Sequence, residues 1–68
     1  MTLTVNGESR EVARTETVAG IVARLAGSGA ARGVAVAVNG DVVPRSAWAT
    51  TELRDGDAVE VLTAVQGG

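Results

Sequence analysis

The sequence predicts one small α+β domain with two layers, in which a single main helix packs on a small mixed sheet. Three observations support this prediction. The chain has 68 residues, which is room for one domain. Val-rich segments separated by turn signals favour strands, and one stretch carries apolar residues at helical spacing. The predicted order along the chain is β-β-α-β-β-β.

A β-hairpin is predicted at the start of the chain. Residues 3–5 alternate apolar and polar side chains, which is typical of a half-buried strand. Asn6-Gly7 follows, and this pair favours a tight turn because both residues tolerate positive φ. We expect residues 10–13 to return as the second strand.

The main helix is predicted between Thr17 and Gly27. Thr17 can cap the first amides with its hydroxyl, and Gly27 suits the left-handed conformation that ends many helices. Gly20, inside the helix, costs about 1 kcal/mol relative to Ala. The apolar stripe expected to face the sheet consists of Val18, Ile21, Val22 and Leu25.

The middle of the chain predicts a loop followed by a second hairpin. Gly and Ser in residues 27–33 indicate a flexible loop, and their spacing does not fit a dinucleotide-binding fingerprint. Residues 34–38 are apolar throughout, as in a strand covered on both faces or flanked by close neighbours. Asn39-Gly40 turns the chain, and Pro44 ends the returning strand or marks a sheet edge, because it has no amide proton.

The C-terminal third completes the predicted sheet. Residues 46–48 can form a short helical turn, and residues 59–64 form the last strand. Between them, Asp55 and Asp57 flank Gly56. They could suggest a carboxylate pair, but we interpret them as turn residues, because Asp and Gly are typical of turns.

The composition excludes several classes of function. The chain has no His, Cys, Lys or Tyr, so the usual metal ligands, nucleophiles and general bases are missing. We therefore predict a protein that is not an enzyme and that holds neither a metal nor a tightly bound cofactor. A net charge of −2 and one aromatic residue argue against nucleic acid. No apolar run could span a bilayer and no signal peptide is recognisable, so we expect a cytoplasmic protein without membrane contact.

Two apolar residues are candidates for a partner surface. Trp48 is the only Trp: exposed, it could anchor a partner, and buried, it would supply bulk to a core of small aliphatic residues, which is the interpretation we favour. Leu53 and the sheet face near the C-terminus are further candidates. Arg45 and Arg54 are interpreted as solvated surface, with partner contact as the alternative.

The C-terminus is the candidate functional group. The chain ends in Gln66-Gly67-Gly68 directly after the last predicted strand. Such an ending is often a frayed terminus. Here, however, two residues without side chains could enter a narrow channel of a partner enzyme and present the α-carboxylate of Gly68. A partner would have to activate that carboxylate with ATP, because nothing in this chain could hold Mg-ATP.

An ordered set of segments resembles one family over essentially the whole chain. The segments are residues 5–8, 17–19, 34–40, 42–46, Trp48, 53–61 and the terminal Val65-Gln66-Gly67-Gly68. Each is weak alone, and together they resemble the ThiS family of sulfur carriers in thiamin biosynthesis. The resemblance implies the ubiquitin-like β-grasp fold over residues 1–64, with the last strand beside the first, and a flexible Gly-Gly tail over residues 65–68.

The resemblance also implies a mechanism in which other enzymes act on this chain. A ThiF-like E1-type enzyme would use ATP and Mg to adenylate Gly68. A persulfide donor would supply sulfur, and the thiocarboxylate would pass it to the thiazole synthase ThiG. These partners would recognise the tail residues Val65, Gln66 and Gly67.

Three other functions stay open on the sequence alone. A carrier of the MoaD type, for molybdopterin synthesis, also ends in Gly-Gly, although the short chain and Val65-Gln66 favour the thiamin pathway. A ubiquitin-like modifier would be joined to lysines of its targets through Gly68. An interaction module would carry the Gly-Gly ending without using it.

Overall fold

The computed structural model describes residues 1–26 and 33–63. The elements are β1 (Thr2–Val5), β2 (Glu8–Glu11), α1 (Val18–Ala26), β3 (Val34–Val38), β4 (Asp41–Val43), the 3₁₀ turn η1 (Arg45–Ala47) and β5 (Ala58–Thr63). This order confirms the predicted β-β-α-β-β-β arrangement and the short helical turn. The helix stop at Gly27, most of the loop at 27–33, and the boundary between a domain at 1–64 and a tail at 65–68 fall outside the described residues.

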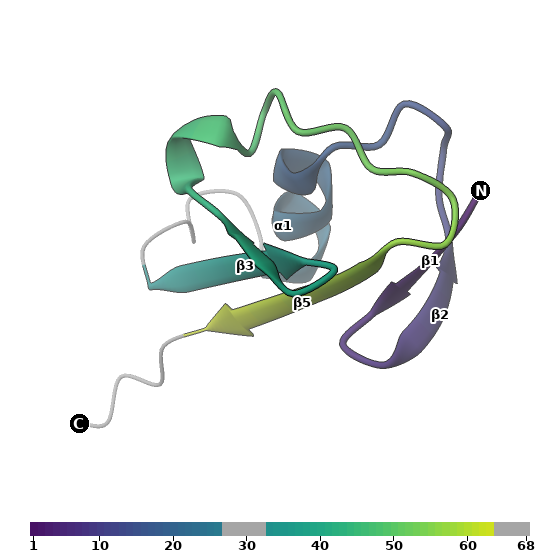
Figure 1. Ribbon diagram of the computed structural model, residues 1–68, viewed down its shortest axis with the longest axis horizontal. Coiled ribbons are helices and arrows are strands. Elements are labelled where there is room, and N and C mark those ends of the chain that lie inside the picture. Colours follow the sequence, from purple (N-terminus) through teal and green to yellow (C-terminus); the bar gives the residue numbers. More distant parts are fainter. Residues whose placement is uncertain (27–32, 64–68) are drawn as a thin grey trace.

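The five strands form one mixed sheet in the order β2-β1-β5-β3-β4 (Figure 1). The last strand, β5, lies in the middle of this sheet, parallel to β1 and antiparallel to β3. The outer strands β2 and β4 each form a hairpin with their neighbour in sequence. The position of β5 beside β1 is the arrangement implied by the resemblance.

Both Asn-Gly turns form as predicted. Asn6 and Asn39 each have φ 51°, and Gly7 and Gly40 follow with φ of 83° and 87°. Two successive residues with positive φ are typical of the type I′ turns that join antiparallel strands. The predicted range of the second strand was wrong by two residues at each end: the tight turn lets β2 begin at once, with Glu8 opposite the last residue of β1.

The start of α1 is held by its cap and by the segment that precedes β5. The amide of Gly20 donates to Thr17 Oγ1 at 3.2 Å, which confirms the predicted cap. The amides of Val18 and Ala19 donate to backbone carbonyls of residues 48–51, each at 3.0 Å. The first amides of a helix have no carbonyl partner within the helix itself, so these bonds satisfy them. The connection between η1 and β5 therefore fixes the position of α1.

The hydrophobic core lies between α1 and one face of the sheet. Its buried residues are Leu3, Val5, Val18, Ile21, Val22, Val36, Trp48, Leu53, Val59 and Val61. Three of the four residues of the predicted helical stripe are in this core. The fourth, Leu25, is 37% exposed because it lies over a groove beside β2 and not over the sheet. In the described part of the chain, no helix has the length and apolarity needed to cross a membrane.

Candidate functional site

The base of the predicted tail is β5, which ends at Thr63. The proposed working residues Val65, Gln66, Gly67 and Gly68 lie outside the described residues. The structure therefore describes how the strand that leads to them is held. Two asparagines, one in each Asn-Gly turn, contribute most of the side-chain hydrogen bonds to this strand.

Asn6 binds β5 from the β1 side. Its backbone amide donates to the carbonyl of Val59 at 2.9 Å. Its side chain then pairs with both backbone groups of Val61: Nδ2 donates to the carbonyl at 3.1 Å, and Oδ1 accepts from the amide at 2.8 Å. A side-chain amide thus takes the place of a peptide group, and it extends the ladder beyond the point where β1 turns away into the hairpin.

Asn39 binds the beginning of β5 from the β3 side. Its backbone amide donates to the carbonyl of Ala58 at 2.8 Å, and its Oδ1 accepts from the amide of Ala58 at 3.0 Å. Its Nδ2 donates to Asp57 Oδ1 at 3.0 Å. The two turns that join the outer hairpins are therefore also two clamps on the central strand.

The Asp-Gly-Asp segment is a turn, as predicted, and its carboxylates are occupied by backbone amides. Asp55 Oδ1 accepts from the amide of Thr2 at 2.8 Å, and Asp57 Oδ2 accepts from the amide of Arg54 at 2.8 Å. Gly56 has φ 87°, a conformation that favours glycine. Within residues 1–26 and 33–63, no group of three or more His, Cys, Asp or Glu could hold a metal ion.

Trp48 and Leu53 are core residues, which agrees with the interpretation favoured for Trp48 and leaves little of either side chain for the alternative, a partner surface. Their exposed fractions are 6% and 3%. Trp48 also donates its indole N–H to the carbonyl of Val43 at 2.9 Å, which satisfies the one polar atom of the buried ring. Both side chains close the core beneath the connection between β4 and β5, and this explains their burial.

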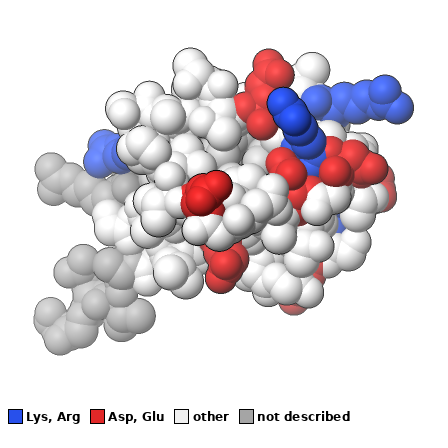
Figure 2. Space-filling view, viewed as in Figure 1, with Lys and Arg blue, Asp and Glu red and all other residues white. Residues whose placement is uncertain are grey.

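The exposed apolar surface lies instead on the sheet face opposite α1. Val42 and Leu62 are 76% and 65% exposed. The register places Ala35 beside Leu62 and Ala37 beside Val42, so these four residues share one face, which we call the outer apolar face. The view in Figure 2 shows most charged side chains gathered away from the end of β5, with mainly uncharged surface near it.

Strand β3 was predicted to be either covered on both faces or flanked by close neighbours, and the second alternative is the one observed. The strand is flanked on both edges, by β5 and β4, but only its helix-facing side is covered. The sequence did contain a signal for the outer apolar face. In Val59-Glu60-Val61-Leu62 the alternation of buried and exposed positions requires an outward residue at 62, and that residue is Leu.

The chain was compared with known proteins. Residues 3–68 match the ThiS family. The crystal structure of the thiamine biosynthesis protein ThiS from Geobacter metallireducens is 40% identical, with a TM-score of 0.80 and full coverage of both chains. The solution NMR structure of a thiamine biosynthesis protein from the same organism gives the same identity and TM-score, with 88% of that chain covered.

A longer relative is a thiazole synthase of Paramagnetospirillum magneticum, 35% identical over all 68 residues. This chain spans only 20% of that protein's length, so the two are related through one segment. The family match extends over nearly the whole sequence, and the Geobacter structures have the same fold at substantial identity. The chain therefore belongs to the ThiS family, the small sulfur carriers of thiamin biosynthesis.

Proposed function

We propose that this chain carries sulfur as a thiocarboxylate on Gly68 and delivers it for the thiazole ring of thiamin. A ThiF-like E1-type enzyme adenylates the Gly68 carboxylate with Mg-ATP. The outer sulfur of a persulfide donor then attacks the terminal carbonyl carbon and displaces AMP, and a thiol cleaves the resulting acyl disulfide, which leaves the thiocarboxylate on Gly68 and a disulfide on the donor side. A thiazole synthase of the ThiG type takes that sulfur in exchange for one oxygen atom on the terminal carbon, and the carrier returns with a free carboxylate, so it is a co-substrate and not a catalyst.

The observation that carries this proposal is the position of β5. A strand in the middle of the sheet, clamped by Asn6 and Asn39, leads into a sequence that ends in Gly67-Gly68. A partner enzyme that binds such a domain therefore meets the end of β5 at a defined position. Accurate placement of reacting groups has a large effect on rate, since a displacement of about 1 Å can cost roughly 100-fold.

The outer apolar face is the surface that we propose the partner enzymes use to hold the domain. It includes Leu62, one residue from the end of β5, so a protein docked there would lie close to the start of the tail sequence. An exposed apolar patch bordered by polar residues is typical of protein interfaces. The link to thiazole synthase is supported by the relative from Paramagnetospirillum magneticum, whose sequence contains a segment like this whole chain. We further propose that this exchange takes place in the cytoplasm.

The test is the intact mass of the protein after incubation with Mg-ATP, a ThiF-type enzyme and sulfide. We expect replacement of one oxygen by sulfur, a gain of about 16 Da, which fragmentation should place on Gly68. Sulfide attack on the acyl-adenylate breaks the bond to AMP and forms one C–S bond, so AMP should appear in equal amount.

Two controls define what a negative result means. A reaction without ATP should leave the mass unchanged, because the free carboxylate has no good leaving group. A chain without Gly68 should fold as before and gain no sulfur. If the intact chain gains no mass while AMP is still formed, water and not sulfide attacks the acyl-adenylate; this result contradicts the carrier proposal, and a modifier of protein lysines becomes the better one.

A further inference from the structure

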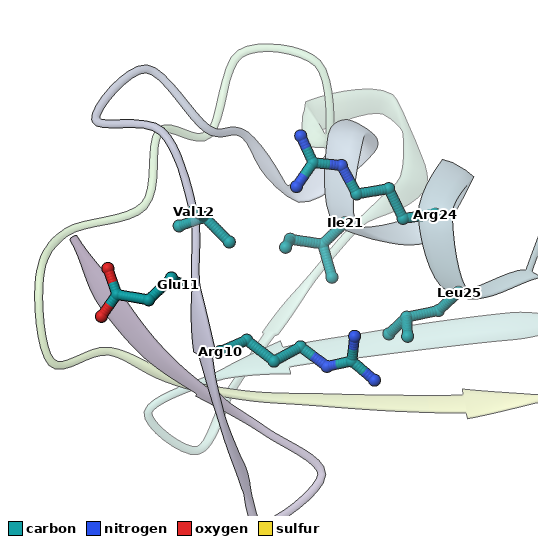
Figure 3. A pocket seen from close by; sticks show the side chains of 6 residues that line it. All are labelled: Arg10, Glu11, Val12, Ile21, Arg24 and Leu25. Atoms are coloured by element: carbon teal, nitrogen blue, oxygen red, sulfur yellow. The ribbon is translucent and has the colours of Figure 1, made fainter.

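A groove lies between β2 and α1, on the helix side of the sheet and therefore opposite the outer apolar face (Figure 3). Its volume is about 200 Å³. Val12, Ile21 and Leu25 form an apolar floor, and Arg10 and Arg24 reach toward it from the strand and from the helix. Glu11 also borders the groove, but its carboxylate points away and accepts a hydrogen bond from the hydroxyl of Thr2.

The strand that borders the groove is an edge strand with hydrogen-bonding groups that face outward. Within the described residues, β2 pairs only with β1. Met1 and Val12 exchange two backbone hydrogen bonds of 2.8 Å each, so they are a hydrogen-bonded pair of the antiparallel ladder between β1 and β2. Alternate residues of such a strand bond to the neighbour and the others face away. The N–H and C=O groups of Ser9 and Glu11 therefore point to the open side of β2.

The two arginines keep capacity for another anion. Arg10 is 3.8 Å from the carboxylate of Glu8, and both side chains are largely exposed, so this ion pair is weak. Arg24 lies 3.0 Å from Glu16 Oε2, a buried oxygen that makes this ion pair without hydrogen-bond alignment. Its guanidinium has five N–H donors, and the side chain remains 60% exposed.

We propose that this groove binds an extended acidic segment of a protein partner, which adds as a further strand beside β2. Backbone bonds would form with Ser9 and Glu11. Side chains of an added strand alternate between its two faces, so every second side chain would face the groove. The segment that fits has an apolar residue for the floor, with a carboxylate two positions before it and another two positions after it for Arg10 and Arg24. This inference is independent of the chemistry at Gly68.

The experiment uses the full ¹⁵N-labelled chain and a capped pentapeptide, Asp-Thr-Ile-Thr-Asp. For so short a ligand we expect a dissociation constant on the order of 1 mM. Amide shifts should be largest at Ser9, Glu11 and Val12, and methyl shifts at Ile21 and Leu25. Matched peptides separate the two requirements: Lys-Thr-Ile-Thr-Lys reverses the charges, and Asp-Thr-Ser-Thr-Asp removes the apolar contact. Each should bind at least about fivefold more weakly.

Protein variants locate the site. Arg10→Glu should weaken binding about tenfold and Arg24→Gln about fivefold. Arg45→Glu makes the same charge change as Arg10→Glu at an exposed residue outside the groove, and should have little effect. Ser9→Pro removes an outward N–H while leaving the β1 ladder intact, and should also weaken binding. Circular dichroism checks that each variant is folded.

Three results would overturn the proposal. One is the absence of localised shifts up to about 5 mM peptide. Another is equal binding of the acidic and the charge-reversed peptide. The third is a concentration-dependent dimer in analytical ultracentrifugation that Arg10→Glu abolishes, because a second copy of this chain would then occupy the edge of β2.

Discussion

Replacing Asn6 should loosen the C-terminal half of β5 without breaking the hairpin in which the residue lies. Asn6→Gly keeps the positive φ of 51° accessible and removes only the side chain that pairs with Val61. Each hydrogen bond contributes about 0.5–1.5 kcal/mol. The loss of two, which leaves both backbone groups of Val61 without these partners, should lower the free energy of unfolding by about 1–3 kcal/mol.

Two further variants separate the causes. Asn6→Ala loses the same hydrogen bonds and also places a Cβ in the left-handed conformation, which should add about 1 kcal/mol. Asn39 has the same φ of 51° as Asn6, and Asn39→Gly also removes two side-chain hydrogen bonds. These two bonds, however, are exposed to solvent. We expect it to cost about half as much as Asn6→Gly, in the order of 0.5–1.5 kcal/mol.

Urea unfolding followed by the fluorescence of Trp48 measures these differences, because this buried side chain is the only Trp. A domain of 68 residues is stable by roughly 3–10 kcal/mol, so the Asn6 variants should remain folded and still shift the midpoint clearly. Hydrogen exchange supplies the local measurement: the amide of Val61 should lose protection in Asn6→Gly and keep it in Asn39→Gly.

The reasoning would be refuted by either of two results. One is an unfolding free energy for Asn6→Gly within about 0.5 kcal/mol of the parent chain, since two intact partly buried bonds should be worth more. The other is unchanged protection of Val61 relative to Val36, its neighbour on β3. Either would mean that the side chain of Asn6 does not hold this strand.

Three further predictions concern other parts of the chain. A C-terminal extension beyond Gly68 should abolish sulfur loading measured by intact mass, while the circular dichroism spectrum stays the same. Leu62→Ser should raise the KM for the adenylating enzyme several-fold with little change in stability, because the side chain is 65% exposed; an unchanged KM would remove the outer apolar face from the docking model. Gly20→Ala should miss the usual gain of about 1 kcal/mol, because a Cβ would overlap the Glu16 carboxylate. In a Glu16→Ala background the same substitution should recover that gain in urea unfolding.

Local signals were sufficient to predict the order of elements. The Asn-Gly pairs required positive φ, and both turns formed where they occur. Strand β3 has the predicted limits, since Gly33 and Asn39 flank an uninterrupted apolar run. The prediction was wrong where contacts between distant parts of the chain determine the limits of an element or the exposure of a residue. The limits of β2 depend on its register with β1, and the exposure of Leu25 depends on how α1 crosses the sheet.

The site was predictable in part, for a related reason. The chemistry was assigned to Gly68 by elimination and by resemblance, and those residues lie outside the described part of the chain. The role of Asn6 could not be found in the sequence, because its partner Val61 is 55 residues away. Gly20 was interpreted as a cost to the helix, whereas its missing side chain leaves space for Glu16, which accepts from the amide of Thr17 and pairs with Arg24.

The central place of β5 has a mechanical consequence under the proposed function, in which other enzymes would bind the C-terminal residues. Hydrogen bonds in a sheet run across the strands, so a pull along β5 loads its bonds to β1, to β3 and to Asn6 in shear and at the same time. An edge strand under the same force could peel away one bond after another. A domain built in this way should therefore resist unfolding when β5 is pulled along its axis, because several hydrogen bonds must break together.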